Sequence, residues 1–306
     1  MKLSIVATLY QSAPYIQEFY ARASAAAEKL VGEDYEIVLV NDGSPDNSLE
    51  LAVQLTEQDQ HIVVVDLSRN FGHHKAMMTG LAHATGERVF LIDSDLEEEP
   101  EWLLDFSRQM ENEACDVVYG VQEKRKGGWF EQLTGSMFWE LIIYLSGCSI
   151  DKNQVTARLM NKLYVSSLLK HQESEIFIAG LFFITGFDQK PKIVNKSSIS
   201  LTTYNLRRKL SLFINSVTSF SNLPLVGIFY FGVIISSLSL IYIVYLLIGW
   251  FFLSTSVLGW TSVIVSLWLL GGLIISFIGV VGIYLSKVFI EVKNRPNSII
   301  RKIYGA

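Results

Sequence analysis

Hydrophobic residues in the first 120 positions fall into short runs separated by segments with helical spacing. Five runs have the length of buried strands: Leu3–Leu9, Glu36–Val40, Ile62–Leu67, Arg88–Ile92 and Asp116–Tyr119. The segments between them predict helices at Pro14–Leu30, from Pro45 onward with Ser44 as N-cap, at His74–Ala84 and at Pro100–Met110. Strands that alternate with helices predict an α/β fold with a mostly parallel, doubly wound sheet.

The last third of the chain has a different pattern. No Asp, Glu, Lys, Arg or His occurs between Leu210 and Ser286. Within this segment, Leu223–Leu253 and Trp260–Ser286 are each long enough to cross a bilayer, and two buried core helices are the alternative. Basic residues flank the pair, at Arg207, Arg208 and Lys209 before it and at Lys287, Lys293, Arg295, Arg301 and Lys302 after it. The positive-inside rule therefore predicts a hairpin with both flanks in the cytoplasm.

The segment between the two parts predicts an interfacial helix. Leu206, Leu210, Phe213 and Val217 recur at helical spacing, and the cations gather at the N-terminal end. The expected organisation is a catalytic domain at 1–202, an interfacial amphipathic helix at 203–222, a transmembrane hairpin at 223–288 and a cytoplasmic tail at 289–306.

Composition narrows the function. Half of the residues are hydrophobic, and the mean hydropathy of +0.32 is high for a soluble domain. Acids and bases are mixed, with a net charge of −5 and no long basic tract, so we expect no nucleic acid partner. Cys115 and Cys148 lack metal-site spacing and are interpreted as reduced structural thiols. The first strand is not followed by Gly-x-Gly-x-x-Gly, which argues against nicotinamide chemistry.

Two aspartates stand at the end of the fourth predicted strand. Asp93 and Asp95 are one residue apart, so in a regular strand they point to the same face. Carboxylates in this position can hold Mg²⁺ or Mn²⁺, whose remaining ligands are phosphate oxygens and water. The alternative interpretation is a solvated acidic start of the next helix.

Four spaced motifs carry a resemblance to glycosyltransferase family 2. They are Thr8-Leu-Tyr-Gln, Asn41-Asp-Gly-Ser, Asn70-Phe-Gly, and Asp93-Ser-Asp followed by Pro100-Glu101. The resemblance implies a GT-A fold and a nucleotide-sugar donor. It implies that Thr8 and Tyr10 line the nucleotide pocket and that Asp42 holds the base or ribose. By the same resemblance, Asp93 contacts the donor, and Asp95 ligates the metal together with Asp93.

The interfacial helix and the two spans resemble the polyprenyl-phosphate glycosyltransferases, which include dolichyl-phosphate mannose synthases and bactoprenol glucosyltransferases. This implies inverting transfer of one sugar to polyprenyl phosphate at the cytoplasmic face of a bacterial inner membrane, for modification of an envelope glycan such as an O-antigen. A UDP-sugar is the expected donor, although the sequence does not distinguish it from a GDP- or CDP-sugar. The resemblance also suggests a homo-oligomer, a tetramer, with Lys287–Tyr304 as a candidate contact.

Basic residues are expected to hold the acceptor phosphate. Arg125, in Lys124-Arg-Lys-Gly-Gly, is interpreted as a clamp because guanidinium binds phosphate bidentately, and an exposed basic loop near anionic lipid is the alternative. Arg158, in Ala157-Arg-Leu-Met on a late strand or helix start, is expected to be the second anion ligand.

Four positions depart from the family pattern or carry no predicted chemistry. Gln122 and Thr156 stand where many relatives have Arg and an Asp proposed as the base. Either Asp151 substitutes, or a phosphate nucleophile needs no base, and we favour the second interpretation. His73 and His74 are expected to be a solvated helix start without chemistry. Two other functions stay open: a transferase that extends a lipid-linked saccharide, and a non-catalytic nucleotide-binding scaffold.

Overall fold

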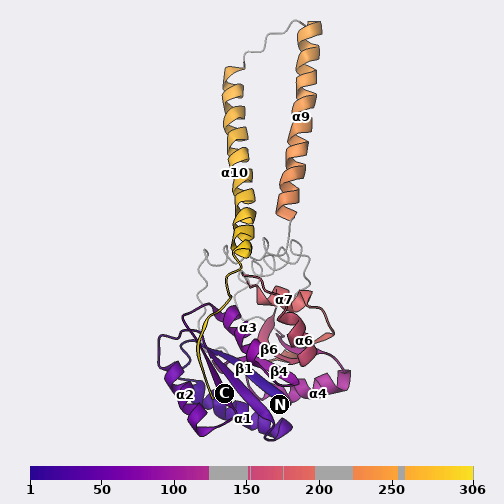
Figure 1. Cartoon of the computed structure of the whole chain (residues 1–306). Coiled ribbons are helices and arrows are strands. Elements are labelled where there is room, and N and C mark those ends of the chain that lie inside the picture. The colour runs from indigo at the N-terminus through magenta and orange to yellow at the C-terminus, as the bar shows by residue number, and fades with distance from the viewer. Residues whose placement is uncertain (124–150, 152, 175, 197–222, 254–258, 306) are drawn as a thin grey trace. The chain divides into compact units, whose positions relative to one another are not determined.

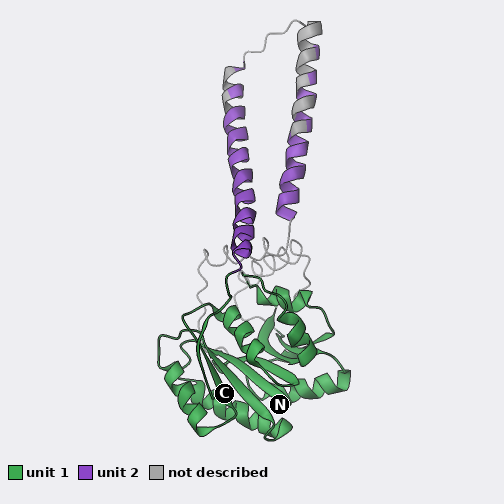
Figure 2. Ribbon diagram, in the orientation of Figure 1, with its two compact units in different colours: residues 1–144, 148–209, 295–306 green, residues 145–147, 210–294 purple. Residues whose placement is uncertain are grey.

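The computed structural model describes residues 1–123, 151, 153–174, 176–196, 223–253 and 259–305. The chain forms two compact units (Figure 2). Unit 1 contains residues 1–144, 148–209 and 295–306, and unit 2 contains residues 145–147 and 210–294. Each unit is described by itself below.

Unit 1 is built on one sheet of eight strands among the described residues, in the order β7-β5-β6-β4-β1-β2-β3-β8. Strands β1, β4 and β6 of this sheet are labelled in Figure 1. The strands are β1 (Leu3–Leu9), β2 (Tyr35–Asn41), β3 (Ile62–Leu67), β4 (Arg88–Asp93), β5 (Val117–Gln122), β6 (Gln154–Asn161), β7 (Gln189–Val194) and β8 (Ile300–Tyr304). Strands β1 to β4 are mutually parallel, and β7 is parallel to β5. Of these described strands, β6 and β8 run antiparallel to their neighbours.

Helices cover both faces of the sheet. They are α1 (Ile16–Val31), α2 (Ser48–Gln58), α3 (His73–His83), α4 (Trp102–Glu113), α6 (Lys162–Leu168) and α7 (Ile178–Ile184). The apolar sides of α1, α2 and α4 pack on the odd-numbered residues of β1 and β2 in one large core. Helix α3 packs on the opposite face, where a Cβ on Gly80 would lie 2.5 Å from the Val6 side chain and 2.8 Å from that of Val40. The missing side chain lets α3 approach the sheet closely.

The alternating pattern of the first 120 residues is confirmed. All five predicted strands are present, and the sheet is mostly parallel with helices on both faces. The predicted start of α2 was wrong, because the helix begins at Ser48 and not at Pro45. Ser44 is not its N-cap: the Ser44 hydroxyl instead accepts from the Gln11 backbone N–H at 2.7 Å. Arg158 lies on a strand, β6.

The predicted tail, residues 289–306, is divided between the two units. Residues 289–294 belong to unit 2 and residues 295–306 to unit 1, where β8 pairs antiparallel with β3. Tyr304 packs against the large core, and the hydroxyls of Ser298 and Thr79 lie 2.7 Å apart. The end of the chain is therefore an edge strand of the domain that its beginning forms.

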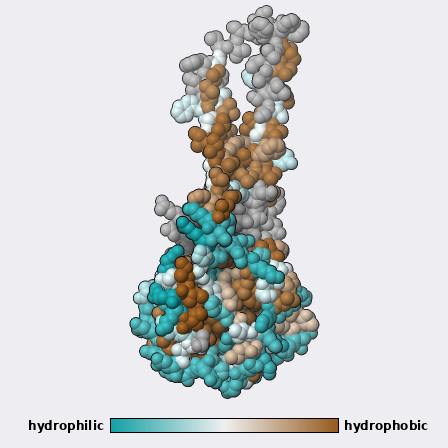
Figure 3. All heavy atoms as spheres, in the orientation of Figure 1, coloured by the Kyte–Doolittle hydropathy of each residue, from teal (hydrophilic) through white to brown (hydrophobic). Residues whose placement is uncertain are grey.

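Unit 2 contains two long apolar helices, α9 (Leu223–Leu253) and α10 (Trp260–Val292). Their described side chains are mostly hydrophobic, whereas hydrophilic residues cover much of the visible surface of unit 1 (Figure 3). Among the described residues, one stretch, Ser266–Val292, is long and apolar enough to cross a membrane by length and composition, and a shorter apolar stretch covers Leu223–Ile235. The predicted interfacial helix at 203–222 lies outside the described residues.

Candidate active site

Three neighbouring strands bring the predicted donor-site residues together. Strand β1 lies between β2 and β4, and the register pairs Thr8 with Asp93 and Leu9 with Asn41. The hydroxyl of Ser94 donates to the Thr8 carbonyl at 2.8 Å, which ties the ends of β1 and β4 together. The site thus lies at the carboxyl ends of parallel strands, where open α/β sheets bind ligands.

Asp42 is buried and held by backbone groups. Its two carboxylate oxygens accept from the N–H of Phe71 at 2.7 Å and of Gly72 at 3.0 Å. Burial raises the pKa of Asp42, although these two hydrogen bonds act in the opposite direction. The carboxylate therefore joins the loop after β2 to the loop after β3.

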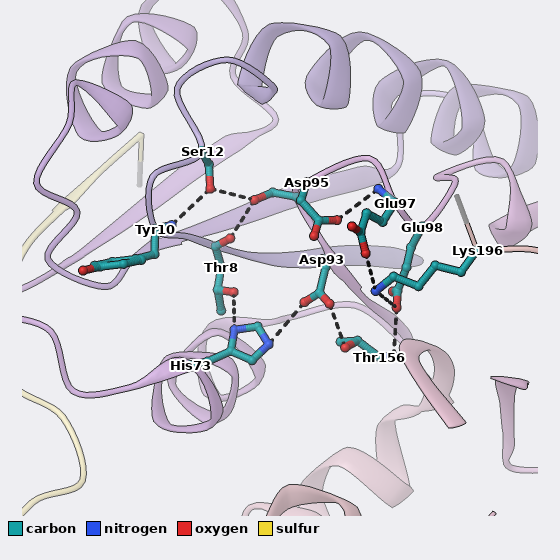
Figure 4. Close-up of polar contacts among 11 residues, drawn as sticks. Thr8, Tyr10, Ser12, His73, Asp93, Asp95, Glu97, Glu98, Thr156 and Lys196 are labelled. Carbon is teal, nitrogen blue, oxygen red and sulfur yellow. Dashed lines mark hydrogen bonds and ion pairs between the residues drawn. The ribbon is translucent and has the colours of Figure 1, made fainter. Parts of the chain in front are cut away.

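Asp93 is fixed by residues from two other elements (Figure 4). The Thr156 hydroxyl on β6 donates to Oδ2 of Asp93 at 2.8 Å. Nε2 of His73 lies 3.3 Å from Oδ1 of Asp93, and Nδ1 of His73 lies 3.0 Å from the Thr8 hydroxyl. Burial raises the pKa of Asp93, but the contact with His73, the charge of Lys196 and the hydrogen bond from Thr156 together hold it below its usual value.

Both histidines stand at the start of α3 as predicted, and His73 is exposed there, but His73 also contacts the predicted donor site. Its ring links the Thr8 hydroxyl to the Asp93 carboxylate. Burial lowers the pKa of His73, but contact with Asp93 outweighs burial and raises it above the ordinary value. Nδ1 of His74 lies 3.0 Å from the Ile176 carbonyl oxygen. Sequence reasoning missed His73 because a histidine after Gly72 also fits an exposed helix start.

Asp95 follows in a tight turn. Its Oδ1 accepts from the Glu97 backbone N–H at 3.0 Å, and Leu96 between them has φ of 59°. This left-handed conformation is uncommon for leucine and marks a constrained turn. Burial and the adjacent charge of Asp93 raise the pKa of Asp95. Asp93 and Asp95 therefore have different surroundings, with Asp93 locked and Asp95 in the turn beyond it.

The two aspartates fit a metal that is completed by a ligand. Within the described residues, no group of three or more His, Cys, Asp or Glu side chains is arranged to hold a metal ion. Mg²⁺ is commonly bound through one or two carboxylates together with substrate phosphates. Oδ1 of Asp93 is buried, and its contact among the described residues is the 3.3 Å approach of His73 Nε2, which does not meet hydrogen-bond geometry. The donor set therefore suits a metal–diphosphate complex better than a resident protein-only site.

A second acidic pair lies beside Asp95. Nζ of Lys196 is 3.3 Å from Glu97 Oε2 and 3.5 Å from Glu98 Oε1, and Glu98 also accepts from the Thr156 N–H at 3.0 Å (Figure 4). Glu98 is fully buried. Burial, and next the charge of Asp93, raise its pKa to about 7. Sequence reasoning missed Lys196, because the segment Gln189–Val194 before it contains Pro191 and two lysines and was not recognised as a strand.

Glu98→Gln should flatten the pH dependence of stability. Since folding raises the Glu98 pKa, the folded state keeps a proton that the unfolded state loses, and the free energy of unfolding falls as pH rises from about 4.5 towards about 7. A neutral glutamine removes this pH-dependent loss of stability. Thermal unfolding of the full chain between pH 5 and 8 measures the dependence, with the substitution Glu50→Gln at an exposed position as control. Equal pH slopes for wild type and Glu98→Gln would contradict the assignment.

Tyr10 and Arg158 differ in their exposure to solvent. The Tyr10 side chain is half exposed beside the end of β1. The Arg158 guanidinium is buried, with its carbon 3.2 Å from the Phe182 ring centre, and burial lowers its pKa to about 10. Its role in binding the acceptor phosphate stays a prediction. Arg125 lies outside the described residues. Asp151 accepts a hydrogen bond from the Tyr119 hydroxyl.

The sequence profile of Glycosyl transferase family 2 matches residues 4–163. A Mycobacterium tuberculosis protein described in general terms as a glycosyltransferase is 52% identical over 306 residues, which are 100% of this chain and 89% of the relative. The prophage-derived bactoprenol glucosyl transferase of Shigella flexneri is 30% identical over 304 residues, which are 99% of this chain and 98% of the relative.

A solved structure shares the fold. The mannosyltransferase of Pyrobaculum calidifontis in complex with GDP-mannose and Mn²⁺ superposes with a TM-score of 0.50 at 15% identity. The match covers 71% of this chain and 63% of the mannosyltransferase, which is less than two thirds of that chain. Its fold agrees with a GT-A-like arrangement of the mostly parallel sheet. With a family profile over half of its length and relatives of this similarity along all of it, the chain belongs to glycosyl transferase family 2 and is a glycosyltransferase.

Proposed function

We propose that this glycosyltransferase moves one sugar from a nucleotide-sugar donor, a UDP-sugar, to polyprenyl phosphate at the cytoplasmic face of a bacterial inner membrane. The observation that carries the proposal is an acidic donor site in a sheet whose last strand follows a long apolar helix. The full-length similarity to a bactoprenol glucosyl transferase supports the same acceptor.

The connection between the units supports a membrane hairpin. The chain belongs to unit 1 at Lys196 and again at Ser298, which contacts Thr79 on α3. A chain that leaves and rejoins one folded unit crosses a bilayer an even number of times. If α10 spans the membrane, a second crossing must precede it, and α9 is the candidate among the described elements. Unit 1 and the C-terminus then lie on the same side of the membrane. The basic residues that flank the hairpin favour the cytoplasm as that side.

Cysteine labelling tests this topology. We expect Ser256→Cys, between α9 and α10, to react with an impermeant maleimide added to intact spheroplasts, in a chain whose native cysteines are replaced by serine. Gln60→Cys, at an exposed position before β3, should react only after the membrane is opened. The reverse pattern would contradict the cytoplasmic site.

The donor is proposed to bind across the ends of β1, β2 and β4. Asp42 and Thr8 would hold the nucleoside, with the exposed Tyr10 ring beside them, and Asp93 and Asp95 would hold Mg²⁺ or Mn²⁺ against the diphosphate. When bound, the cation would neutralise charge on the leaving diphosphate as a Lewis acid. His73 contributes by holding Asp93 in place.

The acceptor supplies its own nucleophile. A phosphate oxygen of the lipid forms a bond to the anomeric carbon while the bond to the donor diphosphate breaks, and the electron pair leaves with the nucleoside diphosphate. Attack from the opposite face inverts the anomeric centre. Thr156 stands where many relatives have the proposed base, and its hydroxyl donates a hydrogen bond to Asp93. A threonine hydroxyl does not act as a general base. An acceptor that is already anionic does not need a base.

Bringing two anions together requires positive charge. Lys196, whose pKa is raised by the surrounding carboxylates although burial lowers it, is a described cation near Asp93 and Asp95. We propose that Arg125 binds the acceptor phosphate, whereas the guanidinium of Arg158, the second anion ligand predicted from the sequence, is buried against Phe182. A homo-oligomer also stays a proposal.

Incubation of the purified full chain with radiolabelled UDP-sugars and undecaprenyl phosphate tests the proposal. We expect label in the organic phase only when the lipid and a divalent cation are both present. Label that appears only on a preformed lipid-linked saccharide would favour the chain-extending alternative. Nucleotide binding without transfer to any acceptor would favour the scaffold.

A further inference from the structure

The strand that follows the apolar helices contacts the loops that hold Asp42. Strand β8 pairs with β3, and the register shifts between Asp66 and Leu67, which pair with Lys302 and Ile300. Arg301 therefore stands at an irregularity of the ladder. A register shift of this kind redirects a side chain. Here the Arg301 guanidinium lies beside β3 and the loop that follows β3.

Arg301 makes two contacts with different partners. Its Nη1 lies 3.5 Å from Asp66 Oδ2, and its Nη2 donates to the Ser68 carbonyl at 2.7 Å. Asp66 is fully buried, and its Oδ2 has no hydrogen-bond partner among the described residues. A buried carboxylate is costly unless a cation compensates it. Arg301 is the cation that the structure places beside this oxygen.

The first contact leads to the loop after β2. The other oxygen of Asp66 accepts from Nδ2 of Asn41 at 2.8 Å, and Oδ1 of Asn41 accepts from the Ser44 N–H at 3.2 Å. Because both ends of the amide are used, the orientation of Asn41 is fixed. Asn41 directly precedes Asp42, so Asp66 sets the backbone from which the Asp42 carboxylate projects.

The second contact leads to the loop after β3. Ser68 begins the segment 68–72, whose Phe71 and Gly72 donate their N–H groups to Asp42. This segment lies tightly against the loop after β2, since a Cβ on Gly43 would be 2.4 Å from the Asn70 nitrogen. Arg301 thus contacts the loop after β3 directly and is linked to the loop after β2 through Asp66 and Asn41.

We propose that Arg301 is a positioning residue for donor binding, through which the strand after the apolar helices sets the geometry of the nucleotide pocket. The inference rests on the proposed function, because it takes Asp42 as part of the donor site. Arg301 acts through Asp66, Asn41 and the Ser68 carbonyl.

Calorimetric binding of UDP with Mn²⁺ to the full-length protein in lipid nanodiscs tests this role. Arg301→Met should raise the Kd for UDP about fivefold, because coupled positions of this kind change binding by about 1 kcal/mol. In turnover assays the KM for the donor should rise by a similar factor, while kcat and the KM for lipid stay near wild type. Lys302→Met is the matched control, since Lys302 is the adjacent cation of the same strand and lies over the Tyr304 ring.

Two further variants separate positioning from general stability. Arg301→Lys keeps the charge near Asp66 but lacks the fork that reaches Ser68, so its Kd should fall between those of wild type and Arg301→Met. Asp66→Asn in the Arg301→Met background removes the uncompensated buried charge and should recover part of the lost affinity. Recovery of donor affinity by charge removal is not expected if Arg301 only stabilises the edge strand.

The outcomes separate this inference from the proposed function. If wild type binds UDP and both Arg301 variants bind it equally well, Arg301 does not position the donor site and the inference alone is overturned. If Arg301→Met lowers the unfolding temperature while the UDP Kd of the folded fraction is unchanged, the contact is structural and the inference is again overturned. Wild type that binds no UDP, GDP or CDP overturns both.

Discussion

Asp95→Asn should lower turnover about 1,000-fold or more while leaving the fold intact, because it removes an anionic ligand from a hard cation that stabilises the leaving diphosphate. Asp95 lies in the turn after β4, where its Oδ1 accepts a hydrogen bond from the Glu97 N–H. The amide oxygen of asparagine can accept the same hydrogen bond. The structural role of the side chain is therefore retained by asparagine. Initial rates with a saturating donor, measured across a range of Mn²⁺ concentrations, test this expectation.

The control for Asp95→Asn is Glu99→Gln, a nearby acidic residue that is expected to keep activity near wild type. Circular dichroism and the unfolding temperature should match wild type for both variants. If Asp95→Asn or chelator-treated protein retained most of its turnover, the assignment of Asp95 to a metal would be wrong.

Asp42→Asn should weaken UDP binding about 10- to 100-fold. Both oxygens of Asp42 accept backbone N–H groups, so an amide can satisfy only one of them and turns a donor towards the other. A buried N–H left without an acceptor costs about 1–3 kcal/mol, and the loops after β2 and β3 would separate to relieve it. Calorimetric titration with UDP measures the loss directly.

Asp34→Asn provides a control for this substitution at the opposite end of β2, where the carboxylate pairs with the exposed N-terminus. We expect no change in UDP affinity for that variant. Unaltered UDP binding by Asp42→Asn would place the nucleotide elsewhere and would remove the basis for the donor site.

The sequence was sufficient to predict the parts of the fold that depend on periodicity. Buried strands of a parallel sheet are continuous apolar runs, and the carboxyl ends of adjacent parallel strands must meet. For this reason the apolar run before Asp93 was enough to predict that Asp93 stands at a strand end, whereas Thr8 and Asp42 were assigned through the family resemblance. The register of β1, β2 and β4 brings the ends of these three strands together.

The remaining parts depend on contacts that no local pattern encodes. His73 takes part in the site because α3 begins beside Thr8 and Asp93, 65 and 20 residues away in the chain. Lys196 follows a polar edge strand, β7, that lacks an apolar run. Strand β8 is a five-residue segment, Ile-Arg-Lys-Ile-Tyr, whose partner β3 lies more than 230 residues earlier. Long-range pairing of this kind is determined by the tertiary fold.

Buried polar groups were the hardest to predict. Arg158 was expected to be an anion ligand, yet its guanidinium is buried against Phe182. Glu98 reads as one of several solvated acids after Asp95, but it is enclosed by the Thr156 backbone and Lys196. Neither the burial of a charge nor its partner can be inferred from the spacing of residues along one segment.

The central claim is that one sugar is transferred to the phosphate of a polyprenyl lipid. Mass spectrometry of the organic extract after reaction of the purified full chain with UDP-glucose, undecaprenyl phosphate and Mn²⁺ tests it most directly, with Asp95→Asn as the inactive control. We expect a new species with the mass of undecaprenyl phosphate plus a single hexosyl residue, and we expect it to be absent from the control. If glucose is not the natural donor, another UDP-sugar should give undecaprenyl phosphate that carries a single residue of that sugar. A ladder of several hexosyl residues, or the absence of any glycosylated lipid with every nucleotide sugar offered, would contradict it.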